Sequence, residues 1–251
     1  MRRVLIALRV EVPSLEANLL TRFFRKMGEV KLIDGWDVDS HTQVYDLAVC
    51  VGPVSSSPLA KKRVLFVFGP SFGHRDLDWD IVVATSPKML DTAVSMFGQN
   101  ARVFLASPPL LNMESGRRRL MEPKKTWMQG SNLWSFVSDG DVDHDPLTRM
   151  TMWSLPEDGR PLFSPMEFNS LALNGGRGFY LSVPDGYDIQ VRRHLALGSP
   201  VVCEREYSVI GELADVCFDS LHGVPDRIEP IPDPVREEDY VAQLDEIMRR
   251  V

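Results

Sequence analysis

The residues best suited to chemistry lie in the segment 183–202. An acidic residue, a glycine and an aromatic residue follow one another there as Asp185, Gly186 and Tyr187, between an apolar run and a helical pattern. This order predicts a loop at the carboxyl end of a buried strand, leading into the N-terminus of a helix. Amide N–H groups and the helix dipole favour an anion at such a point, and Gly186 would let the chain approach a diphosphate closely.

Two adjacent arginines, Arg192 and Arg193, fall in the helical pattern that follows. Their guanidinium groups offer only hydrogen-bond donors and positive charge, so they are predicted to contact a phosphate. Gly198 is expected to end the helix, and Pro200 to set a tight turn into the next strand. The alternative is that these residues only end a helix and form a turn, as in any α/β protein.

No pattern in the sequence predicts a metal site. The five histidines are scattered without the spacing of metal ligands. The acidic stretch 138–145 lacks the glycine and glutamate of an EF-hand loop and is expected to be a surface turn. Cys50, Cys203 and Cys217 lie in separate apolar segments, which is typical of reduced, buried thiols. The prediction is therefore a metal-independent site.

The first half of the sequence alternates apolar runs with helical patterns, and the apolar runs are unbroken, which favours a parallel sheet covered on both faces. Ser14 is the expected N-cap of the first helix and Gly28 its expected stop. Strands are predicted at 3–9, 29–34, 45–51, 63–68, 80–84 and 102–106, and helices at 14–27 and 86–97.

The sequence predicts two lobes, residues 1–110 and 126–251, joined by a polar and basic linker over 111–125. The linker contains the run Arg117–Arg119, expected to be solvated. In the second lobe, strands are predicted at 127–137, 178–183, 199–203 and 216–218, helices at 148–155, 166–173, 189–197, 208–213 and 237–249, and a proline-rich loop at 223–235.

The segment 183–202 resembles the donor-site signature of retaining GT-B glycosyltransferases. The triplet 185–187 stands where that family has Glu-Gly-Phe, and residues 196–202 are similar to its Ala-x-Gly-x-Pro-Val-Val tail. The resemblance is specific over about residues 178–219. One departure concerns Arg193, which replaces a second glutamate and removes a carboxylate that would accept hydrogen bonds from the donor ribose.

The first half carries a weaker resemblance. Ser14 and Glu16 lie between the first strand and the first helix, where the family often has a Gly-Gly-x-Glu element that binds diphosphate or acceptor; the two glycines are missing here. His74 follows the fourth predicted strand, in a loop where family members often carry a histidine. The resemblance implies that Ser14 binds donor and that Glu16 and His74 are catalytic, with a surface-loop histidine as the competing interpretation of His74.

The resemblance implies an α/β protein with two Rossmann-like lobes, whose parallel sheets face a cleft. It implies transfer of a sugar from a nucleoside-diphosphate sugar, with no cofactor or metal, and with Arg177, Arg192 and Arg193 stabilising the leaving diphosphate. The acceptor would be a glycan, a small molecule or a hydroxymethylated base in DNA. The alternative, favoured by Arg193 and the missing glycines, is a binding or assembly protein that has the fold without the chemistry.

Composition sets limits on location and partners. The 251 residues are 44% hydrophobic and 25% charged, with a net charge of -7 and a pI of about 5.3, so a uniformly basic, phosphate-gripping surface is not expected. The first apolar run is too short for a signal peptide, and no run approaches the length of a membrane span. These features predict a cytoplasmic protein. The short length implies a compact acceptor site, or one that another chain completes.

Overall fold

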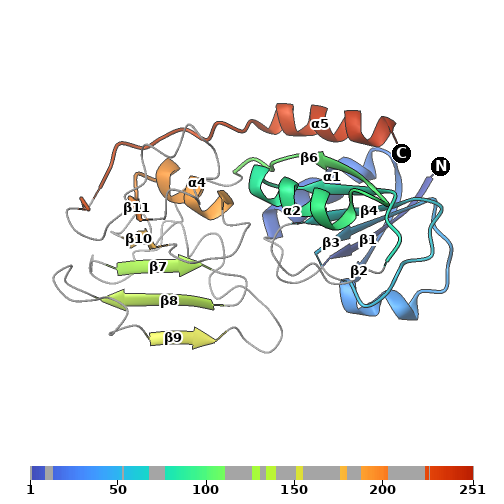
Figure 1. The fold of residues 1–251 in the computed structure, drawn as a ribbon, viewed down its shortest axis with the longest axis horizontal. Helices are drawn as coiled ribbons and strands as arrows, with labels where there is room; N and C mark the ends of the chain where they lie inside the picture. The colour runs from blue at the N-terminus through green and yellow to red at the C-terminus, as the bar shows by residue number, and fades with distance from the viewer. Residues whose placement is uncertain are drawn as a thin grey trace. The chain divides into compact units, whose positions relative to one another are not determined.

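The fold is a mixture of helices and sheets, seen in a computed structural model that describes residues 2–8, 14–52, 54–67, 77–110, 126–130, 134–139, 151–154, 176–179, 188–202, 224–225 and 227–250 (Figure 1). The chain divides into two compact units. Unit 1 comprises Met1–Pro109 and Val235–Val251, and unit 2 comprises Leu110–Pro234.

Unit 1 contains a six-stranded, wholly parallel sheet in the order β2-β1-β3-β4-β5-β6, consistent with a Rossmann-like fold. Its strands are β1 (Arg2–Leu8), β2 (Gly28–Asp34), β3 (Leu47–Val51), β4 (Arg63–Val67), β5 (Ile81–Ala84) and β6 (Arg102–Leu105). Its helical elements are α1 (Ser14–Arg25), the 3-10 helix η1 (Gly35–Ser40), α2 (Pro87–Phe97) and α5 (Glu237–Arg249). The six strands and the helices α1 and α2 confirm the elements predicted for the first half.

Both faces of the first sheet are buried at its four central strands, β1, β3, β4 and β5. Ala7, Cys50, Leu65 and Val82 form a continuous row across β1, β3, β4 and β5, and they pack in one cluster with residues of α2. Strand residues of the other parity are buried too: Val4, Ile6, Val49, Val51, Val64, Phe66, Ile81 and Val83. Because β1-α1-β2 and β5-α2-β6 advance in opposite directions along the sheet, right-handed crossovers place α1 and α2 on opposite faces.

Gly28 differs from its predicted role. Helix α1 ends at Arg25, and Gly28 is the first residue of β2, paired with Arg2 of β1. A Cβ atom at Gly28 would collide with the carbonyl oxygen of Arg2. The glycine therefore permits close approach of two strands and does not cap the helix.

Helix α5 belongs to unit 1, whereas the sequence division placed residues 237–249 in the second lobe. Its apolar face is buried through Tyr240, Leu244, Ile247 and Met248. Its first residue, Glu237, pairs with Arg22 of α1 at 3.1 Å, and the guanidinium of Arg250, just past its end, lies 5.5 Å from the ring centre of Phe104 in β6. An amphipathic pattern predicts that a helix buries one face, but it does not specify against which sheet.

Unit 2 contains a five-stranded sheet in the order β11-β10-β7-β8-β9. Strands β11, β10 and β7 are parallel, while the pairs β7–β8 and β8–β9 are antiparallel. The strands are β7 (Thr126–Gly130), β8 (Trp134–Asp139), β9 (Thr151–Ser154), β10 (Gly176–Phe179) and β11 (Val201–Val202), and the helix α4 covers Asp188–Ala196.

Two predictions for unit 2 are wrong. The expected parallel sheet is mixed, because only residues 131–133 separate β7 from β8 and a parallel connection needs about a dozen residues. The helix expected at 148–155 contains β9, whose Met152 pairs with Phe136 of β8. Cross-strand pairing decides the structure of a short segment that contains an aromatic and a β-branched residue. The linker 111–125 and the elements predicted at 166–173, 208–213 and 216–218 lie outside the described residues.

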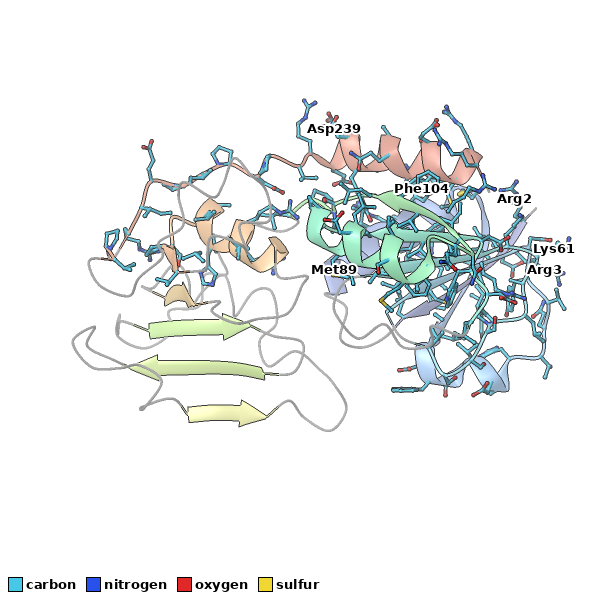
Figure 2. All side chains as sticks on the ribbon, viewed as in Figure 1. Arg2, Arg3, Lys61, Met89, Phe104 and Asp239 are labelled. Carbon is cyan, nitrogen blue, oxygen red and sulfur yellow. The ribbon has the colours of Figure 1, made fainter. Side chains whose placement is uncertain are left out.

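Two carboxylates at the amino ends of the strands in unit 1 repeat one arrangement. Asp46, just before β3, accepts a hydrogen bond from the amide of Arg3 in β1 at 2.9 Å and one from Lys61 Nζ at 2.8 Å. Figure 2 shows Arg3 and Lys61 close together at this end of the sheet. The hydrogen bond from Lys61 and that from Arg3 lower the pKa of Asp46 to about 2.

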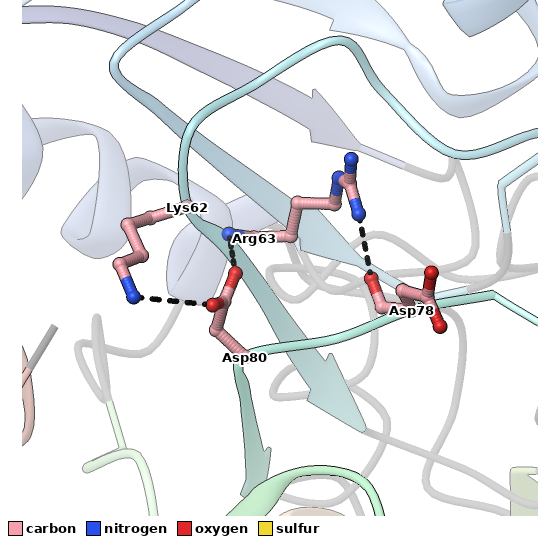
Figure 3. A network of polar contacts seen from close by, with 4 residues as sticks. All are labelled: Lys62, Arg63, Asp78 and Asp80. Carbon is pink, nitrogen blue, oxygen red and sulfur yellow. Dashed lines mark hydrogen bonds and ion pairs between the residues drawn. The ribbon is translucent and has the colours of Figure 1, made fainter.

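Asp80, just before β5, accepts from the amide of Arg63 in β4 at 2.9 Å and from Lys62 Nζ at 3.2 Å (Figure 3). Arg63 Nη1 donates to the backbone carbonyl of Asp78 at 3.4 Å. In both arrangements, the carboxylate of the residue just before one strand accepts a hydrogen bond from a backbone amide near the start of the neighbouring strand. This bond fixes the register of the two strands.

We expect Asp80→Ala to lower the free energy of unfolding of unit 1 by about 1–2 kcal/mol, because the partly buried amide of Arg63 loses its acceptor. Urea denaturation measures the change. Asp78→Ala is the matched control, since Asp78 takes part in the network through its backbone carbonyl, and it should shift stability by less than about 0.5 kcal/mol. Equal losses in the two variants would contradict a role for the Asp80 carboxylate.

Candidate functional site

The candidate site in unit 2 is built on a β-α-β crossover. Strand β10 leads through residues 180–187 to helix α4, and α4 leads to β11, which pairs in parallel with β10. Helix α4 confirms the helix predicted at 189–197, and β11 falls within the strand predicted at 199–203. The triplet Asp185, Gly186 and Tyr187 lies outside the described residues. It directly precedes Asp188, where α4 begins.

The C-terminal end of α4 shows why the sequence folds this way. Gly198 has a positive φ of 71°, which a glycine adopts at little cost. The amide of Ser199 donates to the carbonyl of His194 at 2.9 Å, and the amide of Gly198 donates to that of Leu195 at 3.0 Å. These two bonds form a Schellman motif, and the predicted stop at Gly198 is confirmed.

Helix α4 is buried through its middle. Val191, Arg192, Arg193, His194 and Leu195 are all buried, so this stretch is covered on every side and includes three consecutive basic residues. Buried charge is costly unless it is paired. The partners of these side chains therefore determine what the helix can do.

Arg192 has a carboxylate partner within unit 2. Its Nη1 lies 2.7 Å from Asp233 Oδ1, and the Arg192 side chain is only 1% exposed. Asp233 also accepts a hydrogen bond at Oδ2 from the amide of Leu110, again at 2.7 Å. A phosphate contact by Arg192 stays a prediction, and the phosphate would have to share the guanidinium with Asp233.

His194 is neutral in the folded protein. Burial, together with the positive charge of Arg193, lowers its pKa to about 3. Its Nδ1 lies 2.9 Å from Ser199 Oγ, a hydrogen bond that joins the helix to the residue after the Schellman turn. Arg193 itself is buried, and its predicted contact with phosphate also stays a prediction.

The predicted residues of the first half fall at the carboxyl edge of the first sheet. Ser14 is the first residue of α1 and Glu16 lies in its first turn, and α1 follows β1. From β1 the chain adds β2 on one side, and from β3 onwards it adds strands on the other side, so the topological switch point lies between β1 and β3. Ligands bind at such switch points in open α/β sheets. His74 lies outside the described residues, in the connection from β4 to β5.

The structure thus places Ser14 and Glu16 at one helix start, and it places Arg192 and Arg193 in another helix in the other unit. Sequence reasoning missed Asp233, Leu110 and Ser199. Asp233 stands between two prolines in a predicted loop, and the flanking prolines were the only signal of a fixed backbone at that carboxylate.

Cys50 is a buried free thiol, as predicted, and burial raises its pKa to about 12, so it is not a reactive nucleophile. Cys203 and Cys217 lie outside the described residues. Among the residues that the structure describes, no three or more His, Cys, Asp or Glu side chains gather as metal ligands would. None of the described helices combines the length and apolar character needed to cross a membrane.

Comparison with known proteins places the chain in no family. No protein-family model matches the sequence, and no curated protein matches it either.

The low pKa of His194 predicts a pH-dependent stability. The unfolded state binds a proton near the ordinary histidine pKa of 6.5 and the folded state does not until about pH 3, so stability is lost as the pH falls through this interval. We expect His194→Gln to remove a slope of about 1.4 kcal/mol per pH unit below pH 6.5.

Urea denaturation of both proteins between pH 6.5 and 5 measures this slope while most carboxylates stay ionised. His41→Gln on the half-buried His41 is the matched control and should keep the wild-type slope. Parallel stability curves for wild type and His194→Gln would contradict a neutral buried histidine.

Proposed function

We propose that this protein is a metal-independent glycosyltransferase of the GT-B type, which uses a nucleoside-diphosphate sugar as donor. The observation that carries the proposal is the position of α4. The helix begins at Asp188, immediately after the acidic-glycine-aromatic triplet. It connects β10 to β11, two strands that pair in parallel. The backbone amides and dipole at this helix start favour a diphosphate.

The proposal has further support in unit 1. Its parallel sheet has the switch point between β1 and β3, and α1 begins there with Ser14 and Glu16. In the proposal each of the two units is a Rossmann-like lobe. The mixed character of the second sheet does not affect its parallel part, β11-β10-β7, which carries α4.

In the proposed reaction, the bond between the sugar anomeric carbon and the diphosphate oxygen breaks, and the diphosphate leaves with the electron pair. A new bond forms from the acceptor hydroxyl oxygen to the anomeric carbon, and a base removes the hydroxyl proton. We assign acceptor-side proton transfer or polarisation to His74 and Glu16, and donor binding to Ser14 and residues 185–187. The amides at the start of α4 stabilise the charge that develops on the diphosphate.

The proposed acceptor is a hydroxyl group of a glycan, a small molecule or a hydroxymethylated DNA base. The competing candidate, a binding or assembly protein that has the fold without the chemistry, is favoured by Arg193. This buried arginine stands in α4 where the resemblance calls for a carboxylate that binds the donor ribose.

We expect at least one of the UDP, GDP and ADP sugars to raise the melting temperature of the wild type, with slow release of the nucleoside diphosphate in the absence of acceptor. Thermal shift and a nucleoside-diphosphate release assay measure the two effects. Stabilisation without release would support the binding protein. No stabilisation by any of these nucleotide sugars would contradict the glycosyltransferase.

We expect Asp185→Ala and Gly186→Val to weaken binding of that nucleotide about tenfold or more, because the turn loses its acceptor or its close approach to diphosphate. Isothermal titration calorimetry measures the affinity. Asp37→Ala, in the exposed first turn of η1, is the matched control and should bind as the wild type does. Unchanged affinity in both turn variants would rule out this turn as the donor site.

A further inference from the structure

Asp233 lies at the junction through which unit 2 is connected to the rest of the chain. Unit 2 begins at Leu110 and ends at Pro234. We call the last residues of unit 2, 228–234, the leaving segment. Asp233 belongs to this segment, and its Oδ2 accepts a hydrogen bond from the amide of Leu110 at 2.7 Å, so one residue connects both ends of the unit. Its Oδ1 accepts a hydrogen bond from Arg192 Nη1 at 2.7 Å, so the same carboxylate also binds helix α4.

The environment makes these bonds strong and specific. The Arg192 side chain is almost fully buried and that of Asp233 is 14% exposed, so water screens the pair poorly. Charge-assisted hydrogen bonds of this length are stronger than neutral ones. Removing the carboxylate would leave the Arg192 guanidinium without this counter-charge in a buried position.

Prolines stiffen both connecting segments. Pro108 and Pro109 precede Leu110, and Pro232 and Pro234 flank Asp233. Each proline ring fixes its own φ near −65° and also restricts the residue before it. The direction in which each segment leaves the Asp233 carboxylate is therefore constrained by the backbone.

The leaving segment is also tied along α4. The amide of Ile228 donates to the carbonyl of Gly198 at 3.1 Å, and the amide of Ile231 donates to that of Leu195 at 3.0 Å. The hydrogen bond between Asp233 and Arg192 is the third contact of this segment. The three contacts, at Gly198, Leu195 and Arg192, are spaced by about one helical turn towards the N-terminus of α4. The last of these contacts, at Arg192, lies about one helical turn from Asp188, where α4 begins after the proposed donor residues.

We propose that Asp233 is a positioning residue, which holds α4 and both connecting segments of unit 2 as one rigid joint and so fixes the donor turn at the start of α4. The joint itself is formed by the hydrogen bonds of Asp233 in unit 2, and the positioning of a donor rests on the proposed function. Asp233 acts through Arg192 and makes no contact with the donor.

The first test measures the joint without any ligand. In Asp233→Ala we expect the Leu110 amide to exchange with solvent about tenfold faster or more, since it loses its acceptor, with α4 amides also less protected. The amides of Ile228 and Ile231 keep their own acceptors and should change less. Asp239→Ala, which breaks the exposed pair with Arg236, is the matched control and should leave the exchange rates of all these amides unchanged. NMR hydrogen exchange measures the rates, and an unchanged rate at Leu110 would overturn the joint.

The second test separates positioning from stability. The double variant Arg192→Met/Asp233→Leu removes both charges of the pair and should recover much of the melting temperature lost in Asp233→Ala, but it offers no acceptor to the Leu110 amide. We expect its affinity for the tightest-binding of UDP, GDP and ADP to stay about fivefold or more below wild type by calorimetry. Wild-type affinity in this variant would overturn the positioning role.

The two proposals fail in different ways. If the wild type binds none of UDP, GDP and ADP, the proposed donor site fails, while the exchange rate at Leu110 still decides whether Asp233 forms the joint. If the wild type binds a nucleotide and Asp233→Ala binds it equally well, the positioning role fails and the proposed function stands.

Discussion

A buried guanidinium must meet a carboxylate, and this requirement organises the described part of unit 2. Arg192 is fixed in position by its helix, so Asp233 has to lie beside that helix. The backbone on either side of Asp233 must then follow α4, and it does so through the bonds at Ile228 and Ile231. The second oxygen of the same carboxylate brings in Leu110. One electrostatic constraint thus sets the path of two segments that are 123 residues apart in the sequence.

Unit 1 depends on a different constraint, the pairing of buried parallel strands, and this constraint is visible in the sequence. The four central strands, β1, β3, β4 and β5, contain unbroken apolar runs because both of their faces are covered, and each helix has an apolar stripe. Six strands and two helices could therefore be predicted to within a few residues. The carboxylates of Asp46 and Asp80 could not, because they act on strands that are neighbours in space and distant in sequence. Asp46 bonds an amide 43 residues away.

The second half was predicted less well for physical reasons. The strands β7, β8 and β9 are short, and their pairing depends on the short connection over residues 131–133 and on partners that are distant in sequence, such as Met152 opposite Phe136. A window around residues 148–155 contains none of this information. By contrast, α4 and the stop at Gly198 could be predicted, because a Schellman turn and a proline two residues later are encoded locally. The same local code placed the triplet 185–187 ahead of α4, but it could not reveal that Arg192 is paired.

The electrostatics of α4 bear on the proposed donor site more directly than the net charge of the chain. Three successive basic side chains are buried, and the protein limits the cost by keeping His194 neutral and pairing Arg192 with Asp233. Burial and the positive charge of Arg193 together lower the pKa of His194. A protein with an overall charge of -7 can still bind an anion locally, because the amides and the dipole at the start of a helix favour negative charge, and the proposed donor site uses the start of α4 in this way.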